Sequence, residues 1–107
     1  MTIQKYECPV EAVTDLIGGR WKIVILSRLM HGTRRYGEIK HSISNITEKM
    51  LIQQLRQLEE DGLIERKQYP EVPPRVEYSL TKKGKTLVPI FQKIGDWGRE
   101  HLRDRLV

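Results

Sequence analysis

Residues 47–80, TEKMLIQQLRQLEEDGLIERKQYPEVPPRVEYSL, decide the fold of this chain, because they predict a capped helix followed directly by a two-stranded hairpin. Thr47 is a residue type that caps helix N-termini, and Gly62 suits the left-handed position that follows a helix C-terminus. Between them, apolar residues recur at the spacing of one buried helical face: Leu51, Leu55 and Leu58. The sequence therefore predicts a helix from Thr47 to about Asp61.

The hairpin is predicted from two short stretches, residues 63–69 and 75–80, which have the alternating pattern of strands. Pro73 and Pro74 lie between them, and proline has no N–H to donate to a ladder, so both belong to the connection. Lys67 and Arg75 add positive charge beside this stiff loop. A stiff, basic hairpin after a helix is typical of a DNA-binding wing. A plain surface hairpin with a rigid turn is the alternative.

Three helices are predicted before this stretch. Cys8-Pro9 begins the first, because proline is favoured in the first helical turn, and Gly18-Gly19 ends it. Residues 20–30 are apolar nearly all round a helical wheel, which indicates a central core helix. A short helix over about residues 35–42 and a polar turn at residues 42–46 complete a helix-turn-helix.

The last part of the chain predicts a long amphipathic helix capped by Thr81, with a kink or restart at Pro89. So small a domain leaves little for its apolar stripe to cover, so a partner subunit is expected there. Packing against the chain's own core is the alternative. The residues of this helix expected at a dimer interface are Leu87, Phe91, Ile94, Trp97 and Leu102.

The length fits one domain over residues 1–107, and the order of the predicted helices and strands gives it an α+β class that is mostly α. The net charge is +5, which suits DNA ahead of an anionic membrane surface, although a basic surface without a charged partner is the alternative. No apolar run reaches the length of about 18 residues that a membrane helix needs. The start, MTIQKYECPVE, has no apolar signal-peptide core, so a cytoplasmic protein is expected.

Catalytic and metal-binding motifs are not found. The chain has one cysteine, and its histidines lack the spacing of metal ligands. It contains no nucleophile elbow, phosphate-binding loop or dinucleotide fingerprint. The sequence therefore predicts a protein that needs no cofactor or metal and is not an enzyme.

The helix from Thr47 is expected to enter the major groove, since its early turns present hydroxyl, ammonium and amide groups. Base contacts are expected from the helix and the preceding turn: Ser44, Asn45, Thr47, Lys49 and Gln53. Backbone or minor-groove contacts are expected from basic residues and the wing: Arg34, Arg35, Arg56, Lys67, Pro74 and Arg75. An ordinary amphipathic helix with a solvated face is the alternative.

Three segments resemble the HxlR-type transcriptional regulators, relatives of the MarR group: CPVEAVTDLIGGRWKIVILSRL, GTRRYGEIKHSISNITEKMLIQQLRQLEEDGLIER and YPEVPPRVEYSLTKKGKTLVPIFQKIGDWG. The resemblance covers about residues 8–98. It implies a winged helix-turn-helix with dimerisation helices at both ends, acting as a bacterial homodimer on double-stranded DNA. The resemblance thereby adds Val10 of the first helix to the expected dimer interface. An inverted-repeat operator and repression are expected, with the helix from Thr47 as the recognition helix.

Cys8 is a candidate redox sensor, because some members of this family sense electrophiles or oxidants through the cysteine of the Cys-Pro motif. An N-cap cysteine without a signalling role is the alternative. Two further functions stay open. A small molecule could bind in a dimer cleft lined by Trp21, Phe91 and Trp97, or the winged helix could bind protein instead of DNA.

Overall fold

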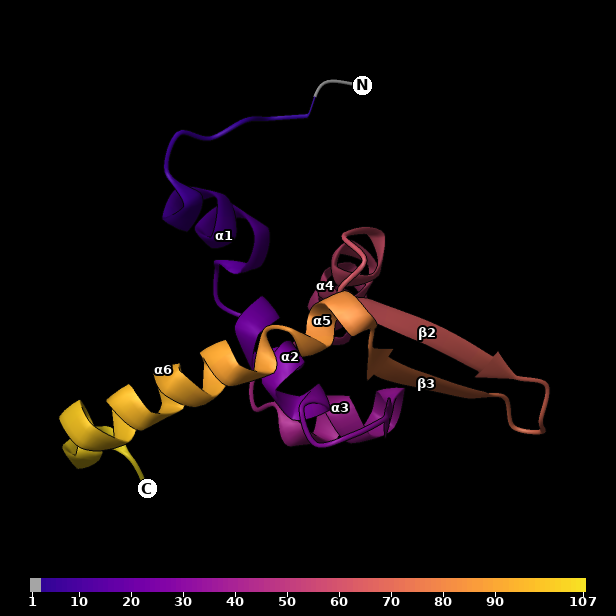
Figure 1. Ribbon diagram of the computed structural model, residues 1–107. Helices are drawn as coiled ribbons and strands as arrows, with labels where there is room; N and C mark the ends of the chain where they lie inside the picture. The colour runs from indigo at the N-terminus through magenta and orange to yellow at the C-terminus, as the bar shows by residue number, and fades with distance from the viewer. Residues whose placement is uncertain (1–2) are drawn as a thin grey trace.

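The computed structural model describes residues 3–107, so residues 1 and 2 of the expected domain lie outside the described part. Its elements follow in the order α1 (Pro9–Ile17), α2 (Lys22–Leu29), β1 (Arg34–Arg35), α3 (Tyr36–Ser42), α4 (Glu48–Glu60), β2 (Ile64–Tyr69), β3 (Arg75–Leu80), α5 (Lys82–Lys85), α6 (Val88–His101) and the 3-10 turn η1 (Arg103–Arg105). In Figure 1 the β2–β3 hairpin projects from the helices on one side, and α6 projects on the other. The expected winged helix-turn-helix is confirmed.

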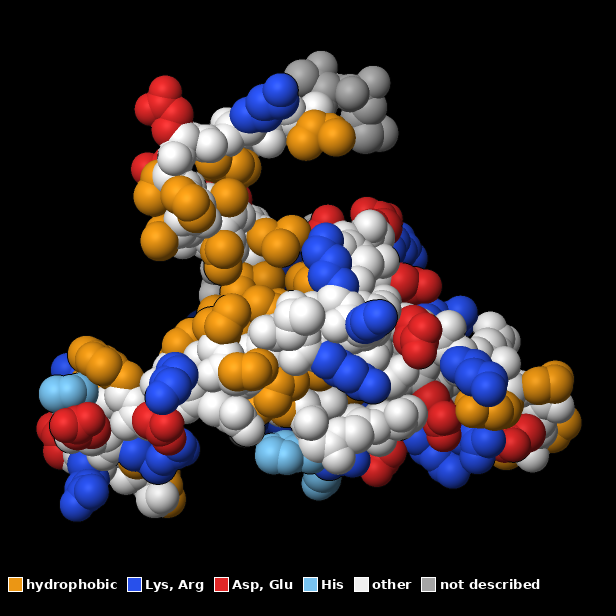
Figure 2. All heavy atoms as spheres, in the orientation of Figure 1, with side chains coloured by type: hydrophobic (Ala, Val, Ile, Leu, Met, Phe, Trp, Pro, Cys, Tyr) orange, Lys and Arg blue, Asp and Glu red, His pale blue; other side chains and the backbone are white. Residues whose placement is uncertain are grey.

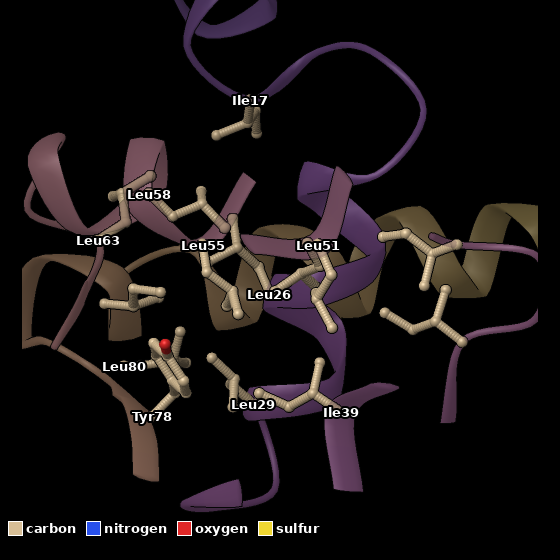
Figure 3. Packing of buried hydrophobic residues seen from close by; sticks show 14 of the residues in the cluster. Ile17, Leu26, Leu29, Ile39, Leu51, Leu55, Leu58, Leu63, Tyr78 and Leu80 are labelled. Carbon is tan, nitrogen blue, oxygen red and sulfur yellow. The ribbon is translucent and has the colours of Figure 1, made fainter. Parts of the chain in front are cut away.

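The core lies where α2 meets α3, α4 and the base of the hairpin (Figure 3). Ile25 and Leu26 of α2 are completely buried, which confirms that this helix is central. The apolar stripe predicted for α4 is confirmed as well, since it lies inside the same cluster: Leu51, Leu55 and Leu58. Burying such side chains contributes about 1.5–3 kcal/mol each relative to exposure.

The start of α4 is held by local contacts that the sequence predicts. The Thr47 side chain accepts a hydrogen bond from the backbone N–H of Met50 at 3.1 Å. Ile46 and Leu51 are both buried on either side of this cap, as a hydrophobic staple requires. At the other end Gly62 has φ of 74°, a left-handed conformation that a glycine adopts without strain.

The sheet has the strand order β1-β3-β2, with both pairings antiparallel. Strand β1 is not predicted by the sequence, which places Arg35 at the start of a helix. In the structure Arg34 and Arg35 pair with Tyr78 and Glu77, and Arg35 is then the N-cap of α3. Two residues are too short to show the alternation that identifies a strand, and their partner lies more than 40 positions away in the chain.

The C-terminal region is two helices, α5 and α6, so the restart predicted at Pro89 is confirmed. Pro89 lies in the first turn of α6, where a missing N–H costs nothing. Phe91 is 7% exposed and belongs to the protomer's own core, which corrects its expected place at a dimer interface. Beyond Phe91, the later turns of α6 project away from the body of the molecule (Figure 1).

Candidate nucleic-acid interface

The turn between α3 and α4 sets the position of α4. Ile43 and Ile46 are buried at its two ends and anchor it to the core. Ser44 and Asn45 lie exposed between these anchors. Asn45 has φ of 67°, a left-handed conformation that asparagine tolerates better than most residues. The two polar side chains are therefore presented at the N-terminal end of α4.

Helix α4 presents a mostly polar exposed face. Its exposed residues are Glu48, Lys49, Ile52, Gln53, Arg56, Glu59 and Glu60. Thr47 is also exposed, and its oxygen accepts the capping hydrogen bond from Met50, which leaves its hydroxyl proton free to donate. Lys49 and Gln53 lie one turn apart on this face. Donors and acceptors of this kind match the hydrogen-bonding pattern of base edges in a major groove.

An open cleft of about 1040 Å³ lies between α3, α4 and the hairpin. Helix α4 contributes Ile52 and Arg56 to its lining, and the hairpin contributes Arg66 and Val76. Arg35 enters from the start of α3. Of the basic residues predicted to bind DNA, the cleft brings together Arg35, Arg56 and Arg75, with Pro74 at the wing tip. It is not lined by the other predicted residues: Arg34, Ser44, Asn45, Thr47, Lys49, Gln53 and Lys67.

The register of the hairpin decides which basic side chain faces this cleft. Arg66 is paired with Tyr78, and Lys67 is paired with Glu77, so the two neighbouring cations lie on opposite faces of the sheet. Arg66 and Tyr78 both line the cleft, whereas Lys67 does not. The sequence prediction included Lys67 and missed Arg66. The alternation of β2 already placed Arg66 on the face of the buried Ile64, and that signal could have found it.

Arg75 is engaged by three side chains of the hairpin. Its Nη2 lies 3.2 Å from Glu71 Oε1, and its Nε lies 3.5 Å from Glu77 Oε2. Its guanidinium carbon lies 4.1 Å from the centroid of the Tyr69 ring. Lys67 Nζ approaches the same ring at 5.0 Å. Arg75 is therefore held in place within the wing.

Tyr36 lies beside the N-terminus of α4 and lines the same cleft. Burial, with the nearby Glu48 carboxylate, raises the pKa of the Tyr36 hydroxyl above its ordinary value. The hydroxyl is therefore protonated at neutral pH, and its oxygen is buried.

A second surface lies on α1 and α6. Val10 of α1 is 71% exposed, and Ile94 and Trp97 of α6 are 52% and 58% exposed. Figure 2 shows hydrophobic side chains gathered over α1 and the junction beneath it. Leu87 and Leu102, which were also predicted at a dimer interface, are half-buried. Cys8 precedes α1 at the N-cap position and is half-buried, and its side chain makes no capping hydrogen bond.

Within residues 3–107, no helix is long and apolar enough to cross a membrane. In the same range, no group of three or more histidine, cysteine, aspartate or glutamate side chains is arranged to hold a metal ion.

Comparison with known proteins places the chain in a family. The model of the HxlR-like helix-turn-helix family matches residues 16–105. The HTH-type transcriptional regulator YkvN of Bacillus subtilis (strain 168) is 50% identical over 96 residues, which cover 90% of this chain and 81% of YkvN.

Solved structures agree. A MarR-family transcriptional regulator from Porphyromonas gingivalis W83 superposes with a TM-score of 0.86 at 46% identity, over 94% of this chain and 99% of that regulator. The oxidised form of the redox regulator HypR superposes with a TM-score of 0.83 at 45% identity, over 88% of this chain and 97% of HypR. The chain therefore belongs to the HxlR-like helix-turn-helix family and is a transcriptional regulator with a winged helix-turn-helix DNA-binding fold.

Proposed function

We propose that this regulator is a homodimeric repressor that binds an inverted-repeat operator in double-stranded DNA. One observation carries the proposal: the exposed, polar N-terminal half of α4 lies beside a cleft with arginines from α3, α4 and the hairpin. Helix α4 would enter the major groove while the hairpin follows the adjacent backbone.

Base and backbone contacts divide between two sets of residues. Thr47, Lys49 and Gln53 would read base edges, with Ser44 and Asn45 entering from the turn. Arg34, Arg35, Arg56 and the wing would contact the backbone, which fixes the register of the protein on the duplex without reading its sequence.

The dimer would form through the exposed apolar side chains of α1 and α6. An interface of two identical chains has a two-fold axis, so the two copies of α4 would read two half-sites of opposite orientation. The half-sites would be centred about 34 Å apart, one turn of DNA.

The experiment that tests this function is selection of bound sequences from a random pool of duplex DNA by the purified, reduced protein. We expect an enriched inverted repeat with the spacing of one helical turn. Strong binding that enriches no sequence would overturn the proposal. It would then favour a protein that holds DNA only by its backbone, or a winged helix that binds another protein.

Replacing Gln53 with alanine is expected to change sequence preference at one position of each half-site by about 1–3 kcal/mol, because a bidentate base contact is lost. The measurement is competition binding against operators with each base varied in turn. Gln57→Ala is the matched control, since it makes the same change two turns from the N-terminus of α4 on a half-buried side chain. Equal base preferences for Gln53→Ala and the unchanged protein would remove Gln53 from the readout.

The similarity to HypR, a redox regulator, favours thiol control through Cys8 at the start of α1. Cys8 is the chain's one cysteine, so its thiol has no disulfide partner within the chain. An oxidant could link it to the partner subunit or to a small thiol through a disulfide, and an electrophile could alkylate it. Because α1 would belong to the dimer interface, such a change would shift the two copies of α4 relative to each other.

Cys8→Ser is therefore expected to keep operator affinity and to lose the response to diamide or a quinone. Titration of operator binding with each reagent, before and after reduction, measures this. A mutant that still releases DNA at the same dose would exclude Cys8. Control by a small molecule in the dimer cleft would then be the better account.

A further inference from the structure

We propose that the hairpin meets DNA through Arg66, in place of the Lys67 and Arg75 contacts expected from the sequence, and that Arg75 is a positioning residue that keeps the wing rigid. This inference rests on the proposed function and assigns its parts within the wing. It follows from the register of β2 and β3, from the contacts of each cation, and from the place of the cleft.

Arg66 and Lys67 differ in what they adjoin, whereas Arg75, which pairs on the face of Lys67, reaches the cleft at the wing end. Arg66 shares a face with Val76 and Tyr78, and all three line the cleft beside α4. If α4 lies in the major groove, the sugar-phosphate strand that separates this groove from the next passes over that cleft. Arg66 is therefore the cation of β2 that faces the strand, whereas Lys67 points away from it.

Arg66 and Arg75 also differ in their ion pairs. Arg66 donates from Nη2 to the neutral amide oxygen of Gln68 at 3.3 Å, and within residues 3–107 it makes no ion pair. Its positive charge remains available to a phosphate. An arginine in this state gains a charge-assisted hydrogen bond when DNA binds, and it breaks no existing ion pair.

The hairpin also carries a cluster whose charges pair with one another, although the buried Arg75 Nε makes no hydrogen bond within the described residues. We call the five residues the wing cluster: Lys67, Tyr69, Glu71, Arg75 and Glu77. Two cations and two carboxylates give it a formal charge of zero, and the Tyr69 ring lies against both cations. A phosphate contact by Arg75 would compete with Glu71 and Glu77 for the guanidinium.

The wing cluster has a mechanical consequence. Glu71 belongs to the loop between the strands, Tyr69 ends β2, and Arg75 begins β3. Arg75 therefore ties both strand ends and the loop together at the point where the hairpin would otherwise fray. A loop held in its bound shape loses less conformational entropy when it settles against DNA.

The first test compares two neighbouring substitutions of equal charge, Arg66→Gln and Lys67→Gln. Operator affinity is measured over a range of salt concentrations with the full chain. We expect Arg66→Gln to weaken every site alike and to lower the slope of log affinity against log salt by about one. Lys67→Gln is expected to leave the slope unchanged. If Lys67→Gln lowers the salt slope by about one and Arg66→Gln leaves it unchanged, the assignment of faces is overturned.

The second test separates positioning from charge at residue 75. The double variant Arg75→Gln/Glu77→Gln leaves the net charge unchanged, and Arg75→Lys keeps the cation but cannot make the same paired and stacked contacts. We expect both to lose affinity severalfold at an unchanged salt slope. If Arg75→Lys binds like the unchanged protein while the double variant loses one unit of slope, Arg75 contacts phosphate directly.

The selection experiment with the unchanged protein shows whether this inference or the proposed function has failed. If it enriches no operator in the selection experiment, the function itself is wrong. If it enriches one and the Arg66 and Lys67 variants behave alike, only the assignment of faces is wrong.

Discussion

Replacing Gly84 with alanine is expected to lower the free energy of unfolding by about 2–3 kcal/mol, as overpacking of a tight contact does. A Cβ at this position would overlap the backbone carbonyl oxygen of Leu63, and it would lie 3.4 Å from Leu80 Cδ2. Neither neighbour can move easily. Leu63 is 1% exposed, and its carbonyl also accepts a hydrogen bond from the Thr81 N–H at 3.1 Å.

Gly84 thus marks the point where α5 is fastened to the start of β2. Thr81 strengthens the junction, since its hydroxyl donates to the Gly62 carbonyl at 2.6 Å and accepts from the Gly84 N–H at 3.0 Å. Moving α5 outward to make room for a methyl group would stretch these hydrogen bonds. Because α6 follows directly, the change would also disturb the packing of Phe91.

Urea unfolding followed by circular dichroism measures the effect. Gly37→Ala is the matched control, since Gly37 lies in α3 and a Cβ there would meet no atom within 4 Å. Alanine restricts the unfolded chain more than glycine does, so Gly37→Ala is expected to be neutral or to stabilise by up to about 1 kcal/mol. Equal urea midpoints for Gly84→Ala and the unchanged protein would show that the junction of α5 and β2 can accommodate a methyl group without loss of stability.

Replacing Trp97 with alanine is expected to weaken the proposed dimer by at least about 2 kcal/mol, roughly 30-fold in its dissociation constant. Trp97 is 58% exposed in the protomer, one turn from the exposed Ile94, so its large apolar surface is free to be buried by a partner. Tryptophan is the residue type most often responsible for binding energy in interfaces. Operator affinity would fall with it, because two half-sites need two copies of α4.

Sedimentation equilibrium of both proteins over a dilution series measures the dimer constant, and operator binding at the same concentrations measures the linked loss. Gln92→Ala is the control, because Gln92 is exposed on the opposite side of α6 from Ile94 and Trp97. A dimer constant that is unchanged by Trp97→Ala would place the interface elsewhere on the chain.

Local sequence patterns determined much of this protein. These patterns account for four features: the N-cap at Thr47, the leucine stripe of α4, the position of Pro73 and Pro74 in the hairpin loop, and the restart at Pro89. Each depends on neighbours within a few residues: a cap bonds to the next turn, helical faces repeat every 3.6 residues, and proline acts on its own backbone. Such effects do not require knowledge of what packs where.

The tertiary structure alone decided three features, and each depends on residues far apart in the chain. Strand β1 exists because β3 offers Arg34 and Arg35 a free edge. Phe91 is buried because the first turns of α6 pack against the core. On the apolar stripe it has the same spacing as Ile94 and Trp97, which stay exposed. The cleft exists because the hairpin lies beside α4; the alternation of β2 puts Arg66 and Lys67 on different faces, and this placement decides that the cleft is lined by Arg66 and not by Lys67. Periodicity specifies which side chains share a face, whereas packing between distant elements decides what that face meets.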